Sequence, residues 1–127
     1  MEIARDQLLD SGRPAVRRYR PGELGVQGVN HTASVILTPT EVIDGWPPQS
    51  AAEITSAHLE QLLVLDPRPE VVLIGTGEKQ VFPTHEVLAP LVRAHIGIEI
   101  MDTSAACRTW NLLLSDDRRV AAALILR

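Results

Sequence analysis

The sequence predicts a single α/β domain built on a mixed central β-sheet, and three observations support this prediction. The chain has 127 residues, the usual size of one domain. Its first half contains short β-branched runs separated by turn residues, a pattern typical of antiparallel strands. From residue 71 onward, apolar runs alternate with amphipathic segments in the order strand, helix, strand, helix, strand. We therefore expect an N-terminal antiparallel part, a C-terminal βαβαβ part with right-handed crossovers, and helices packed on the sheet.

The first half is expected to form strands after a loosely held N-terminal segment. Residues 1–14 are polar and lack clear periodicity, so we expect the α/β domain to span residues 15–127. Asn30 tolerates a positive φ, so residues 30–31 are expected to form a tight hairpin turn. The expected strands are 15–20, 24–29, 32–38 with a β-branched centre at 33–37, and 41–46.

The second half changes to helical periodicity. Leucines at helical spacing predict a helix over 55–65, which two prolines end. A second helix is expected over 84–95, with Thr84 as its N-cap and Gly97 as its stop. Pro90 lies within this segment and lacks a backbone N–H, so we expect a kink or a later helix start.

Thr103 is expected to cap a third helix. The residues expected on its inner face are Ala106, Cys107, Trp110, Leu113 and Leu114. The remaining strands are expected at 71–74, 98–101 and 120–126. The loop before the last strand is short, so its direction stays open.

Composition excludes several classes of protein. Acidic residues number 16 and basic residues 12, and the net charge of −4 disfavours binding to nucleic acids or anionic membranes. A single cysteine excludes an internal disulfide, and the four histidines lack zinc spacing, so we expect no metal site and no cofactor. No apolar run approaches the ~20 residues that span a bilayer, and no secretory signal is evident in residues 1–20. The cytoplasm is therefore the expected location.

Candidate site residues follow two strands expected to be parallel. Ligands collect beyond the carboxyl ends of such strands, here at 75–77 and 102–108. The candidate rim residues are Gly75, Thr76, Gly77, Asp102, Thr103, Cys107, Arg108 and Asn111. The glycines and the start of a helix could bind an anion, although a tight strand-to-helix turn is the commoner meaning of such glycines.

The polar members of this rim each have two interpretations. Asp102 could act as an acid or base, or cap a helix. Cys107 lies near a helix start and Arg108, which favours a nucleophile, yet free cysteines are usually buried and structural. Asn111 follows Cys107 by one helical turn and could hold the helix to the rim loop. No residue is assigned a catalytic role.

A cluster of basic residues lies near the N-terminus. Arg17, Arg18 and Arg20 form a cluster that could bind phosphate. The acidic total favours the alternative, the solvated face of a strand.

Several segments together resemble one known family. They are 70–77 (EVVLIGTG), 97–111 (GIEIMDTSAACRTWN), 33–39 (ASVILTP), Trp46 and 120–125 (VAAALI). In order and spacing this set resembles domain of unknown function 498, a family that includes a mitochondrial complex I assembly factor and small bacterial and archaeal proteins. The resemblance implies a compact α/β fold with a mixed sheet. It implies no established reaction.

Two functions remain open from the sequence. The first is a non-catalytic domain that binds a protein partner, as the assembly-factor relative implies. The second is a small-molecule binder or enzyme that uses the rim at 75–77 and 102–108. We favour the first, and expect no nucleic-acid partner, no membrane insertion, and a monomer or weak homodimer.

Overall fold

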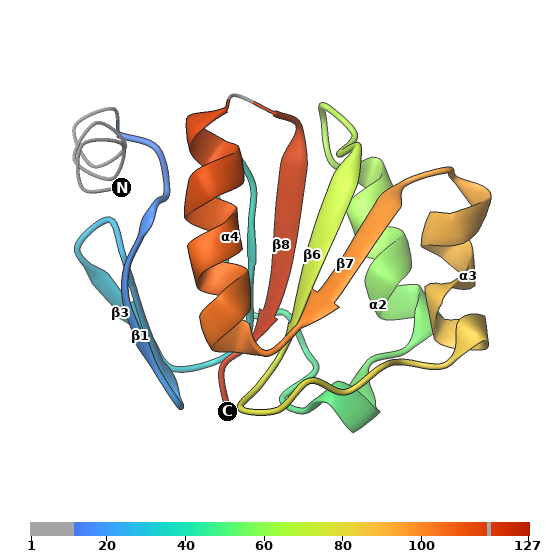
Figure 1. Ribbon diagram of the computed structural model, residues 1–127, viewed down its shortest axis with the longest axis horizontal. Coiled ribbons are helices and arrows are strands. Elements are labelled where there is room, and N and C mark those ends of the chain that lie inside the picture. Colours follow the sequence, from blue (N-terminus) through green and yellow to red (C-terminus); the bar gives the residue numbers. More distant parts are fainter. Residues whose placement is uncertain (1–11, 117) are drawn as a thin grey trace.

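The computed structural model describes residues 12–116 and 118–127, and a five-stranded mixed sheet forms its centre (Figure 1). The strand order is β5-β4-β8-β6-β7. The strands are β4 (Val35–Leu37), β5 (Val42–Ile43), β6 (Val71–Thr76), β7 (Gly97–Met101) and β8 (Val120–Ile125). β6 pairs in parallel with both β7 and β8, whereas β4 pairs antiparallel with β8 and β5. This settles the direction of the last strand: β8 runs parallel to β6 and completes the expected βαβαβ unit.

A second sheet contains three antiparallel strands in the order β1-β2-β3. They are β1 (Val16–Arg20), β2 (Glu23–Val26) and β3 (Val29–His31). Gln27 and Gly28 have φ values of 52° and 78°. Two consecutive positive φ values match a type I′ hairpin turn, whose twist suits the flanking strands. The expected turn at 30–31 is therefore wrong, because Gly28 provides the turn instead of lying within a strand.

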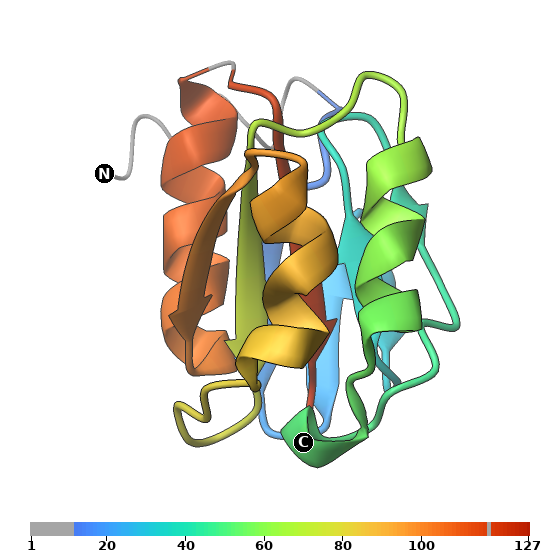
Figure 2. The same ribbon diagram turned by 90° about the vertical axis from the view of Figure 1, so that its right-hand side faces the viewer.

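Helices cover both faces of the central sheet (Figure 2). The helical segments are η1 (Ala51–Glu53), α2 (Ser56–Glu60), η2 (Gln61–Val64), α3 (His85–Arg93) and α4 (Thr103–Ser115). α2 and α3 lie on one face, and α4 lies on the other face between the central sheet and the three-stranded sheet (Figure 1). The helix expected over 55–65 is thus a short α-helix continued by a 3₁₀ helix, and the strand expected over 41–46 shortens to β5.

The closing strand β8 separates two apolar cores. Ala122 and Leu124 pack with α4, whereas Ala121 and Ala123 pack with α2 and α3. All six residues of β8 are buried, as expected of a strand covered on both faces. Its run of alanines lets helices approach both sides of the sheet closely.

Trp110 ties α4 to the three-stranded sheet. Its side chain is fully buried, and its indole N–H donates to the carbonyl of Pro14 at 2.8 Å. Arg13 also donates to the carbonyl of Leu114 near the end of α4. Of the segment expected to be loosely held, residues 1–11 lie outside the described part of the chain.

The helix ends agree only partly with expectation. Thr84 is the N-cap of α3, as expected, and its hydroxyl accepts from the N–H of Val87. Pro90 lies inside α3 without ending it. The stop is His95, at φ 59°, because the N–H groups after the last turn bond back in a Schellman pattern, so the expectation for Gly97 is wrong.

Candidate functional site

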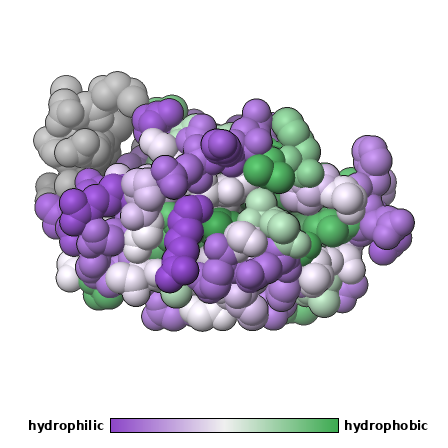
Figure 3. Space-filling model, turned by 90° about the horizontal axis from the view of Figure 1, so that it is seen from below, coloured by the Kyte–Doolittle hydropathy of each residue, from purple (hydrophilic) through white to green (hydrophobic). Residues whose placement is uncertain are grey.

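The carboxyl ends of β6, β7 and β8 meet at one edge of the central sheet, where the sequence placed its candidate rim. The three strands are parallel, and Thr76 at the end of β6 pairs with Ile125 at the end of β8. Figure 3 views the molecule from this side. Hydrophilic residues cover most of the face, and apolar residues form small patches between them.

Thr103 joins the loops at this edge. Its hydroxyl accepts from the N–H of Gly77 at 2.8 Å and donates to the carbonyl of Ile125. Its own N–H donates to the carbonyl of Gly77. The side chain is fully buried. Thr103 is therefore the first residue of α4 and a link between strand ends, not the N-cap that the sequence predicted.

Close packing explains the two glycines of the rim. A Cβ atom on Gly75 would lie 2.9 Å from both Thr103 Oγ1 and Leu124 Cδ2, so Gly75 lets α4 approach β6. Gly77 has a φ of +96°, and a Cβ atom there would collide with the carbonyl oxygen of Arg127. The N–H of Gly77 already donates to Thr103, so this group is not free for an anion.

Thr76 and Asp102 also make local hydrogen bonds. The buried hydroxyl of Thr76 accepts from the N–H of Val81 and can donate to the carbonyl of Lys79 or Met101. A carboxylate oxygen of Asp102 accepts from the N–H of Ala105 at 2.9 Å, which makes Asp102 the N-cap of α4.

The thiol of Cys107 is buried on the inner side of α4. Its side chain is 5% exposed, and burial raises the pKa of Cys107 to about 12. Arg108 lowers this pKa and Asp102 raises it, but burial has the largest effect. The thiolate, not the thiol, is the nucleophile, so the neutral thiol of Cys107 is a poor nucleophile at neutral pH.

Arg108 and Asn111 lie farther along α4, away from the strand ends. Arg108 is exposed and donates to the hydroxyl of Ser104 at 2.9 Å. The amide of Asn111 accepts from the N–H of Val16 at 2.8 Å and donates to the carbonyl of Val16 at 2.9 Å. Asn111 therefore holds α4 to β1, not to the rim loop as expected.

Two hollows lie where α4 approaches β1, and they contain different parts of the predicted rim. The edge hollow, about 270 Å³, is lined by Tyr19, Arg20, Pro21, Gly77, Glu78, Asp102 and Ser104. The arginine hollow, about 180 Å³, is lined by Val16, Arg17, Arg18, Tyr19, Ser104, Cys107, Arg108 and Asn111. Tyr19 and Ser104 form their shared wall. Gly75, Thr76 and Thr103 line neither hollow.

Tyr19 is the main residue that the sequence did not indicate for this site. Its hydroxyl donates to the carbonyl of Leu126 at 2.9 Å. Burial raises the pKa of Tyr19, with smaller contributions from Cys107, Glu78 and Asp102. β1 belongs to a separate sheet, so no local pattern could have placed Tyr19 beside the start of α4.

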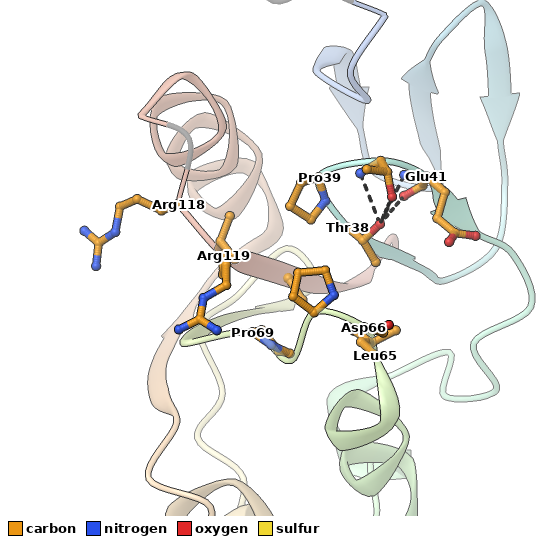
Figure 4. Close-up of a pocket in the computed structure, with 12 residues that line it drawn as sticks. Thr38, Pro39, Glu41, Leu65, Asp66, Pro69, Arg118 and Arg119 are labelled. Atoms are coloured by element: carbon orange, nitrogen blue, oxygen red, sulfur yellow. Dashed lines mark hydrogen bonds between the residues drawn. The ribbon is translucent and has the colours of Figure 1, made fainter.

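A third hollow lies at the opposite edge of the sheet and was not anticipated. This proline hollow, about 220 Å³, is lined by Thr38, Pro39, Thr40, Glu41, Leu65, Asp66, Pro67, Pro69, Arg118, Arg119, Val120 and Ala121. Figure 4 shows Arg118 and Arg119 on one side and Thr38 and Glu41 on the other. Arg118 and Arg119 lie 3.9 and 4.0 Å from carboxylate oxygens of Glu70.

Two further findings concern residues 12–116 and 118–127 only. They contain no group of three or more His, Cys, Asp or Glu side chains arranged to hold a metal ion. They also contain no helix of sufficient length and apolar character to cross a membrane.

The fold and the arrangement of the strand ends together define a small mixed α/β domain in which one helix, α4, lies between two sheets. The family described as "Protein of unknown function (DUF498/DUF598)" matches residues 16–125. The chain belongs to this family, as its sequence motifs predicted.

The chain is similar to proteins that carry different names. It is 34% identical over 103 residues to the "13 kDa major membrane protein" of Francisella tularensis, covering 80% of each chain. It is 31% identical over 115 residues to zebrafish NADH dehydrogenase (ubiquinone) 1 alpha subcomplex assembly factor 3, covering 91% of this chain and 66% of that one. The human protein of the same name is 35% identical over 89 residues, which are 70% of this chain and 48% of that one.

Solved structures show the same fold. A crystal structure from Bordetella parapertussis matches with a TM-score of 0.84 and 35% identity, over 91% of this chain and 98% of that one. An NMR structure from Xanthomonas campestris matches with a TM-score of 0.78 and 39% identity, over 88% and 83%. These likenesses agree with the mixed α/β architecture.

Proposed function

We propose that this chain is a non-catalytic module that binds other proteins, in the manner of an assembly factor. One observation carries the proposal: the polar groups of the rim are bonded to, or buried against, other groups of the same chain. The hydroxyl of Thr103 links strand ends, Asp102 caps α4, and the thiol of Cys107 is buried with a pKa of about 12. The assembly-factor name of the zebrafish and human relatives supports the same function.

The test is capture of crosslinked complexes from the cells that make the chain. Variants Cys107→Ala and Asp102→Asn remove the two side chains best suited to chemistry, and asparagine preserves the N-cap. A binding module keeps the same reproducible partners, in the same yield, in both variants. A chain that has no reproducible partner contradicts the proposal.

The second candidate is a small-molecule binder or enzyme. The two neighbouring hollows favour it, since Asp102 lines one and Cys107 the other. Each hollow is smaller than the roughly 300–1,000 Å³ of typical ligand pockets, so we rank it second. Titration of the ¹⁵N-labelled chain with a metabolite mixture separates the two candidates. Saturable shifts at Asp102 and Cys107 would support a ligand site.

Location and assembly state form part of the proposal. We propose a cytoplasmic protein that is a monomer or weak homodimer. The membrane-protein name of the Francisella relative defines the alternative location. Cell fractionation tests the compartment, and sedimentation equilibrium at several concentrations tests the assembly state.

A further inference from the structure

The arginine hollow unites two basic features that lie about ninety residues apart in the sequence. Arg17 and Arg18 come from β1, and Arg108 comes from α4. These are three of the chain's 12 basic residues, although acidic residues outnumber basic ones in the whole chain. This local cluster of positive charge therefore contrasts with the net negative charge of the whole chain.

These arginines form no close ion pair within the described part of the chain. Arg17 and Arg18 form no ion pair there, and Arg108 donates only to the neutral hydroxyl of Ser104. Arg20 and Arg118 differ, since Arg20 bonds to Glu23 and Arg118 lies 3.9 Å from Glu70. The pKa of Glu23 is lowered mainly by its hydrogen bond from Arg20 and, to a smaller extent, by the charge of Arg18. The positive charge without a nearby carboxylate partner therefore comes from Arg17 and Arg108.

Rigid walls hold the charges in place. Arg18 extends across Gly25, where a Cβ atom would lie only 2.8 Å from the arginine side chain. The next pair in the register, Tyr19 and Leu24, packs toward the core with α4, so the side chain of Arg18 lies on the opposite face of the sheet. Arg17 and Arg108 therefore provide the charged side chains of the hollow. The double hydrogen bond between Asn111 and Val16 fixes the separation of α4 and β1. A partner segment bound in the hollow beside this contact would meet preorganised donors, which lowers the entropic cost of binding.

We infer that the arginine hollow binds an acidic segment of a partner protein, lying along the side of β1 that faces α4. This inference rests on the proposed function and names the chemistry of the partner. The negative side chains of the segment would pair with Arg17 and Arg108. Glu78 and Asp102 line the adjoining edge hollow, so they restrict the acidic part of the segment to the arginine hollow.

The experiment uses a fluorescent oligoglutamate peptide and an oligoglutamine peptide of equal length. Fluorescence anisotropy measures the Kd, and spectra of the ¹⁵N-labelled chain locate the contact. We expect the acidic peptide to bind and to shift resonances of residues 16–19 and 104–111. We expect Kd to rise with ionic strength, because salt screens exposed charges. The oligoglutamine peptide should not bind.

Three variants test the assignment. Arg17→Gln and Arg108→Gln should each weaken binding by up to about fivefold, the upper range for one exposed ion pair. Arg93→Gln, an exposed arginine of α3 that lines none of the hollows, should leave Kd unchanged. All three positions are exposed, so circular dichroism and urea unfolding should match those of the parent chain.

Several outcomes would overturn the inference. They are an unchanged Kd in both hollow variants, shifts outside the named segments, and no binding at about 1 mM peptide in low salt. Tighter, arginine-dependent binding of inorganic phosphate or single-stranded DNA would assign a different occupant. If the chain that carries both Arg17→Gln and Arg108→Gln still captures every crosslinked partner, this inference fails while the proposed function stands. If the parent chain captures no partner, the proposed function itself fails.

Discussion

Replacing Thr103 by valine tests the link between the strand ends. Valine keeps the shape but removes the hydroxyl, leaving the N–H of Gly77 and the carbonyl of Ile125 without this buried partner. Each unsatisfied buried group costs about 1–3 kcal/mol, so the two groups together should cost about 2–6 kcal/mol. With a urea m-value of about 2 kcal/mol/M, the middle of the usual range, the unfolding midpoint should fall by roughly 1–3 M.

Two controls separate the hydroxyl from the methyl group. Thr103→Ser keeps the hydroxyl and should cost about 1 kcal/mol, the value of one lost carbon group. Thr109→Val lies on the same helix and removes only a contact with Met101 Sδ at 3.5 Å, so it should change stability by about 0.5 kcal/mol or less. If Thr103→Val costs no more than Thr103→Ser, the hydroxyl does not link the strand ends and the reasoning is refuted.

Three further predictions concern the thiol of Cys107, two glycines and the side chain of Asn111. The free energy of unfolding should fall as pH rises from about 9 to about 12, because the thiol of Cys107 ionises first in the unfolded chain. Urea titrations at several pH values measure this fall, and Cys107→Ala should remove the part of it that the thiol causes. Gly28→Ala should cost about 1–2 kcal/mol from backbone strain alone, and Gly77→Ala at least about 2 kcal/mol more from its added collision, measured by urea unfolding. Asn111→Ala should cost about 1–2 kcal/mol and speed amide hydrogen exchange at Val16.

Each of these has a contrary outcome. Rapid alkylation of Cys107 in the native protein at pH 7 would contradict its burial and raised pKa. Equal costs for Gly77→Ala and Gly28→Ala would show that Arg127 moves aside. Unchanged exchange at Val16 would mean that Asn111 does not protect β1.

The sequence predicted the C-terminal half well because its signals are local. The apolar run at 71–74 and the helical spacing of Ala106, Cys107, Trp110 and Leu114 each reflect burial by neighbouring elements, and these residues are buried or nearly so. The hairpin turn failed for a local reason as well. Gly28 fitted an alternating strand pattern, and sequence alone does not show that Gln27 adopts a positive φ.

The candidate site could be predicted only in parts. Cys107 and Arg108 came from one motif, and Arg17 and Arg18 came from a separate basic cluster. Their meeting in one hollow depends on β1 packing against α4 through the Asn111–Val16 contact, a pairing of residues 95 positions apart. Neither periodicity nor spacing carries information about such a tertiary contact.

The position of β8 has a consequence for synthesis on the ribosome. β8 follows β4 and β6 in the chain, yet it lies between them in the sheet. Until residues 120–125 have emerged from the ribosome, β4 and β6 each have an unpaired strand edge, flanked by apolar side chains, that is open to solvent. The nascent chain therefore cannot close its central sheet gradually. It passes through a period in which molecular chaperones, or neighbouring nascent chains, can compete for the place that β8 finally takes.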